Sequence, residues 1–157
     1  MKDISSHLHF FLFFSCSFVP ILWSGLNAID LLKKNKYIAW SGQIVRKAIQ
    51  TMKSAAANSD YNFTCKLRLL EAEQQSLTER HSQAIEVYDA SIKAAKSFGF
   101  IHEQGLACEK AALYFKRVRR NEKAVEYFQQ ARECYQEWGS RMKVAVIQKE
   151  LDALNPN

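Results

Sequence analysis

Residues 69–139 decide the fold of this chain and read LLEAEQQSLTERHSQAIEVYDASIKAAKSFGFIHEQGLACEKAALYFKRVRRNEKAVEYFQQARECYQEWG. One pattern of small and aromatic residues occurs twice in this stretch. The first copy is Ala72, Ala84, Tyr88 and Ser91, and the second is Ala112, Ala124, Phe128 and Ala131. Small residues let two helices approach closely, and an aromatic residue fills the space between neighbouring pairs. Repetition over a few tens of residues is typical of stacked helix pairs.

The composition of the whole chain agrees with a helical fold. Of its 157 residues, 48% are hydrophobic and 24% are charged, and only five are glycine and two are proline. Glycine and proline interrupt helices, so their scarcity predicts long helices joined by short turns. We therefore predict an all-α protein. The formal net charge of +6 favours acidic partners without identifying one.

Apolar residues recur at helical spacing outside the repeated pattern as well. The expected helices cover residues 37–57, 63–78, 83–98, 103–118, 122–138 and 141–154. Gly99 and Gly139 are placed to close two of them in left-handed turns, and the first turn resembles a Schellman cap. The prediction is a right-handed α-solenoid of antiparallel helix pairs, similar to tetratricopeptide repeats, with about six or seven helices. This domain spans residues 36–157, and residues 141–154 form its C-terminal capping helix.

Residues 1–35 are predicted to form an apolar N-terminal helix followed by a basic linker. The apolar segment FFLFFSCSFVPILW begins at Phe10 and ends at Trp23. It has three interpretations: a secretory signal, a membrane anchor and a buried first helix. As an anchor it would leave the lysines at 33, 34 and 36 on the cytoplasmic side. The last two interpretations place the repeats in the cytoplasm, and secretion fits less well because Asp3 dilutes the positive leader.

A series of landmarks between residues 62 and 143 gives a resemblance to a known family, and the resemblance covers about residues 44–152. In order they are Asn62-Phe63, Leu69-Leu70-Glu71-Ala72-Glu73, Tyr88-Asp89, Ile92, Ala95, Gly99-Phe100-Ile101-His102-Glu103, Leu106-Ala107, Glu109, Phe115, Tyr135, Trp138-Gly139 and Lys143. The chain resembles the helical-repeat segment of very large signalling proteins. In those proteins, helical repeats join a kinase-like region and a STAND-type ATPase to a sensor histidine kinase or cyclase. Ser91 and Ser140 depart from that pattern, where alanine is expected. The resemblance implies a connector or scaffold role and transfers no enzymatic activity.

The sequence contains no catalytic motif. Phosphate-binding loops, HExxH, nucleophile elbows and kinase signatures are all missing. The four cysteines, at positions 16, 65, 108 and 134, form no CxxC pair and are expected to be reduced thiols packed as small hydrophobes. The four histidines are scattered. We predict a protein that is not an enzyme and has neither a cofactor nor a metal site.

The first helix of each repeat pair offers a candidate partner groove. In the tetratricopeptide arrangement, the concave surface carries the residues three before and one after the small residue. Those residues are Leu69 and Glu73 in one pair, and Glu109 and Leu113 in the other. Carboxylates and leucines disfavour a clamp for a peptide carboxylate and favour an apolar or basic partner helix. Packing of the same faces on neighbouring helices is the alternative.

A second candidate is a basic patch made of Lys116, Arg117, Arg119, Arg120 and Lys123. Such a cluster can contact phosphates of nucleic acid or lipid. No aromatic platform for bases accompanies it, which disfavours nucleic acid. A helix C-terminus also attracts Lys and Arg through its dipole.

These observations lead to one main hypothesis and two alternatives. The main hypothesis is a non-enzymatic protein–protein interaction or connector module from a signalling protein, which binds a protein or peptide helix. One alternative is a membrane-anchored signalling fragment with a cytoplasmic repeat domain. The other is a binder of phosphate or nucleic acid through the basic patch.

Overall fold

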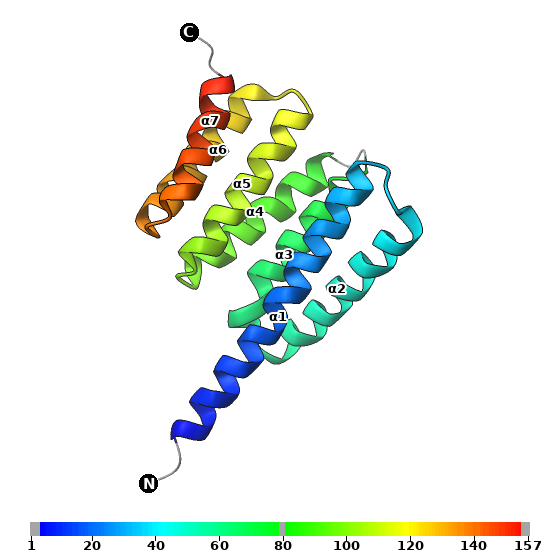
Figure 1. Cartoon of the computed structure of the whole chain (residues 1–157), viewed down its shortest axis with the longest axis vertical. Helices are drawn as coiled ribbons and strands as arrows, with labels where there is room; N and C mark the ends of the chain where they lie inside the picture. The colour runs from blue at the N-terminus through cyan, green and yellow to red at the C-terminus, as the bar shows by residue number, and fades with distance from the viewer. Residues whose placement is uncertain (1–3, 79–80, 155–157) are drawn as a thin grey trace.

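Figure 1 shows the computed structural model of the chain, which describes the backbone of residues 4–78 and 81–154 and the side chains of residues 18–78 and 81–154. Its helices are α1 (Ile4–Lys33), α2 (Ile38–Asn58), α3 (Asp60–Gln75), α4 (His81–Ser97), α5 (Ile101–Arg117), α6 (Asn121–Glu137) and α7 (Arg141–Leu154). Every regular element within the described residues is a helix, which confirms the predicted all-α class.

Helices that follow one another in the sequence pack side by side (Figure 1). The pairs α1–α2, α3–α4 and α5–α6 stack in order, and α7 covers α6. The first helices of successive pairs also touch, since α1 contacts α3 and α3 contacts α5. This arrangement is consistent with the predicted stack of helix pairs, with α7 as its last helix.

The first helix belongs to the stack along its second half. Leu22, Leu26, Ala28 and Ile29 of α1 are buried in the same hydrophobic core as the repeats. The predicted boundary at residues 35 and 36 therefore does not separate two packing units, because α1 and α2 form the first helix pair. The first half of α1 extends beyond the neighbouring helices (Figure 1).

No helix is long and apolar enough to cross a membrane over the residues whose side chains the structure describes. Much of the segment from Phe10 to Trp23 lies outside those residues, because the described side chains begin at Phe18.

The repeated residues form the centre of the core. All eight are buried, and seven of them have no exposed surface, the exception being Ser91 at 1%. The Ser91 hydroxyl donates a 2.8 Å hydrogen bond to the carbonyl of Cys65 on the neighbouring helix, so serine is satisfied where alanine was expected. The residues of the repeated pattern therefore pack the helices together, as the sequence predicted.

Four turns within the described residues use left-handed backbone geometry to end a helix. Gly99 and Gly139 have φ angles of 73° and 83°, while Asn35 after α1 and Arg119 after α5 have φ angles of 53° and 59°. After α4, the Gly99 amide donates to Lys96 and the Phe100 amide donates to Ala95, at 3.2 and 2.9 Å. These two bonds are the Schellman pattern that the sequence predicted.

We expect Gly99→Ala to lower the free energy of unfolding by about 1–2 kcal/mol, because a Cβ is disfavoured in the left-handed region. No atom lies within 4 Å of the added Cβ, so the cost comes from the backbone alone. Gly42→Ala is the matched control. Gly42 is within α2 and its nearest neighbour is the flexible end of Arg46 at 3.8 Å, so the same change should stabilise by about 0.5–1 kcal/mol. Urea unfolding of both variants measures the change in the free energy of unfolding. A change of the same sign in both would contradict the assignment of Gly99 to a left-handed turn.

Candidate functional site

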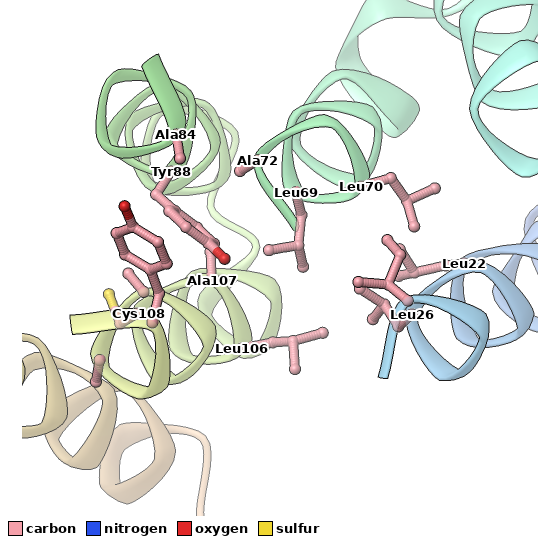
Figure 2. Packing of buried hydrophobic residues seen from close by; sticks show 14 of the residues in the cluster. Leu22, Leu26, Leu69, Leu70, Ala72, Ala84, Tyr88, Leu106, Ala107 and Cys108 are labelled. Carbon is pink, nitrogen blue, oxygen red and sulfur yellow. The ribbon is translucent and has the colours of Figure 1, made fainter. Parts of the chain in front are cut away.

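The structure places two of the four predicted groove residues in the interior. Leu69 is 2% exposed and Glu73 is 1% exposed. Leu70 of α3 faces Leu22 and Leu26 of α1, and Leu69 points toward Leu106 of α5 (Figure 2). Because α1 covers this face of α3, Leu69 and Glu73 do not line an open groove, and this part of the groove prediction is corrected.

Glu73 is the acceptor of a buried polar network. Its Oε2 lies 2.6 Å from the Nζ of Lys33 at the end of α1, and its Oε1 accepts a hydrogen bond from the Tyr88 hydroxyl on α4. Burial, and then the negative charge of Glu73, raise the pKa of Tyr88 well above its usual value. The tyrosine therefore stays a hydrogen-bond donor, and the network joins three helices.

Glu109 occupies a similar network in the next pair. The Tyr135 hydroxyl of α6 donates to its Oε2 at 2.6 Å, and the Nζ of Lys143 on α7 lies 2.8 Å from the same oxygen. Burial and the Glu109 charge raise the pKa of Tyr135. The charges of both predicted groove glutamates are thus compensated inside the chain, which removes the reason to expect a basic partner helix.

Leu113 is the predicted groove residue that reaches the surface, at 38% exposed. One turn later on α5, Arg117 donates a 2.5 Å hydrogen bond to the carbonyl of Ser76. Its guanidinium also lies over the Tyr114 ring, 5.5 Å from the ring centroid. These contacts orient Arg117 toward the end of α3, beside Leu77, which is 37% exposed.

A surface pocket of about 420 Å³ lies at the ends of α1, α3 and α5, which are the first helices of the three pairs. We call it the α1–α3–α5 pocket, and its lining residues are Leu32, Lys33, Asn35, Ser76, Leu77 and Arg117. The sequence did not reveal this site because its residues come from three separate segments. The one available signal was Arg117, which sequence reasoning had assigned only to the basic patch.

The predicted basic patch does not form one free cationic surface. Lys116 pairs with Glu150 at 2.5 Å, Lys123 pairs with Glu126 at 2.7 Å, and Arg117 is bound to Ser76. Arg119 and Arg120 are exposed in the turn between α5 and α6. The carboxylates of Glu150 and Glu126 offset the positive potential of these two lysines, so the structure adds no support to phosphate binding.

The described side chains contain no cluster of three or more His, Cys, Asp or Glu residues that could hold a metal ion. Comparisons with protein-family models, with curated proteins and with solved structures found no match.

Proposed function

We propose that this chain is a non-enzymatic helical-repeat module that binds a short amphipathic helix of a partner at the α1–α3–α5 pocket. The observation that carries the proposal is the exposure of two leucines: Leu77 lines the pocket, and Leu113 is on α5 one turn before Arg117, which also lines it. Peptide helices dock through apolar anchors at helical spacing, and such anchors need an apolar surface next to a depression.

The charge around the pocket indicates the chemistry of the partner. Arg117 is exposed, and no carboxylate among the described side chains pairs with it. Lys33 also lines the pocket, but its ammonium is paired with Glu73, so the free positive charge of the lining is that of Arg117. We therefore expect the partner helix to carry acidic residues next to its apolar anchors, rather than the basic residues that the groove glutamates had suggested.

The connector role implied by the family resemblance is compatible with binding of a partner helix at this pocket. In that case the partner helix belongs to the same large signalling protein, and the module holds neighbouring parts of it together. The proposal places the repeats on the cytoplasmic side, either free or tethered by the apolar segment from Phe10 to Trp23.

A phage library of 16-residue peptides tests the proposal. We expect selection on the intact chain to enrich peptides with apolar residues at helical spacing and at least one acidic residue. The double variant Leu77→Glu/Leu113→Glu should weaken binding of a synthetic enriched peptide more than about tenfold, measured by fluorescence anisotropy, because each change buries a charge in the interface. Arg117→Glu should weaken binding by repelling the acidic residue.

The control variant Met142→Glu/Val146→Glu makes the same change on α7, where both side chains are exposed. It should leave the peptide affinity unchanged, and far-UV circular dichroism verifies that each variant is folded. Enriched peptides that bind the Leu77/Leu113 variant as tightly as the unmodified chain would overturn the proposed site.

A further inference from the structure

Two cysteines lie together at the interface between α5 and α6. Cys108 of α5 has no exposed surface, and Cys134 of α6 is 5% exposed. Each thiol changes the pKa of the other. Figure 2 shows Cys108 within the packed core, among the buried side chains of the repeats. The sequence had indicated only isolated reduced thiols, because the two residues are far apart along the chain.

A glycine brings the two helices close enough for the thiols to meet. Gly105 precedes Cys108 by one turn of α5, and a Cβ at this position would lie 3.2 Å from the Cβ of Cys134. The same Cβ would lie 3.0 Å from Cε1 of Tyr135. The backbone of α5 thus packs directly on the side chains of α6. Helices usually pack about 8–10 Å apart, whereas a disulfide needs Cα atoms within roughly 7 Å, so this close approach favours a bridge.

The two thiols differ in their access to solvent. Cys134 lines a surface pocket of about 360 Å³ between the start of α5 and the end of α6. The other lining residues are Lys96, Gly99, Ile101, Gln104, Glu133 and Glu137. Cys108 has no exposed surface and is not among the residues that line this pocket. A small reagent in the pocket therefore contacts Cys134 before it can reach Cys108.

The two thiols also differ in acidity, and the thiol with the lower pKa is the one that lines the pocket. Pairing with the Cys108 thiol lowers the pKa of Cys134, against the opposing effects of burial and of Glu133 and Glu137. The same pairing, followed by burial, raises the pKa of Cys108. The more accessible sulfur is therefore the one that ionises first, and the thiolate is the reactive form.

We infer that Cys134 and Cys108 form a reversible oxidation site for small hydroperoxides. The Cys134 thiolate attacks one oxygen of the peroxide and the O–O bond breaks. With hydrogen peroxide, the products after proton transfer are the sulfenic acid of Cys134 and one water molecule. The Cys108 sulfur then attacks the Cys134 sulfur, which releases the second water and forms the disulfide. Two thiols lose two electrons in total, and the peroxide gains them. A dithiol reductant reverses the reaction by exchange.

Hydrogen peroxide and the full chain carrying Cys16→Ser and Cys65→Ser provide the test. We expect the intact mass to fall by about 2 Da, and digestion to yield a linked peptide that contains Cys108 and Cys134. The oxidised chain should unfold several degrees higher, because the bridge restricts the unfolded state, and dithiothreitol should reverse both changes. Full retention of free thiols, or a bridge between chains in place of this one, would overturn the inference.

Two further variants in the same background separate the roles of the cysteines. Cys108→Ser should leave Cys134 as a sulfenic acid, which a dimedone probe labels, whereas Cys134→Ser should leave Cys108 unreacted. Cys65, restored alone in a third variant that lacks Cys108 and Cys134, is a matched buried thiol with 1% exposure and a pKa raised by burial. Labelling of Cys65 as fast as Cys134 would show unspecific oxidation and contradict the site.

Discussion

Phe128→Ala is expected to lower the free energy of unfolding by about 3–5 kcal/mol, the usual cost of deleting a fully buried aromatic ring. Phe128 has no exposed surface and lies on the helix face that also carries Ala124 and Ala131. Small neighbours cannot expand to fill the space that the ring leaves, so a cavity should remain. Because typical domains are stable by about 5–15 kcal/mol, this variant should be strongly destabilised. Urea unfolding monitored by circular dichroism measures the loss.

Met142→Ala is the control for this variant. Met142 is 80% exposed on α7, and truncation of an exposed side chain should change stability by no more than about 0.5 kcal/mol. A loss below about 1 kcal/mol for Phe128→Ala would mean that the helix pairs close around the deletion. The repeated aromatic residue would then not be what holds the pair together.

The second large effect is expected at Lys33. Lys33→Ala should lower stability by roughly 3 kcal/mol, at the lower end of the range for breaking a buried ion pair. Glu73 is 1% exposed and would lose its cation, which leaves the Tyr88 hydroxyl as its remaining donor among the described side chains. The lower end applies because the Lys33 side chain itself is 23% exposed and water reaches the site. Thermal and urea unfolding measure the effect.

Two comparisons make this prediction specific. Lys53→Ala removes the cation of a surface pair with Glu71, in which the lysine is 60% exposed, and should cost at most about 1 kcal/mol. The triple variant Lys33→Met/Glu73→Leu/Tyr88→Phe removes the whole network and should recover most of the stability, because no charge is left buried. Equal losses for Lys33→Ala and Lys53→Ala would show that Glu73 is solvated.

Local pattern was sufficient to predict most of the fold. The helix bounds agree within about three residues, and the turns at Gly99 and Gly139 have the predicted left-handed geometry. These features depend on neighbours within one or two turns, which the sequence displays directly. The bounds of α3 differ most, since the helix covers Asp60–Gln75 rather than 63–78. Asp60 is accommodated in the first turn, where its carboxylate accepts a hydrogen bond from Thr64.

The partner groove could not be predicted in the same way. Glu73 looks like a surface carboxylate in its own helix, and the cation that allows its burial is 40 residues away. Periodicity within one helix says which face a residue occupies but not what covers that face. Leu69 is buried because α1 packs on α3, whereas Leu113 is 38% exposed.

The two glutamate networks also have a consequence for how the chain unfolds. Stability in repeat arrays is approximately a sum of the intrinsic stability of each repeat and the coupling between neighbours. Here the carboxylate of α3 is compensated by a lysine of α1, and the carboxylate of α5 is compensated by a lysine of α7. Loss of either terminal helix would leave an ionised group without its counter-ion in the pair that remains. Coupling between repeats therefore includes an electrostatic part, and fraying from the ends is disfavoured relative to a single cooperative transition.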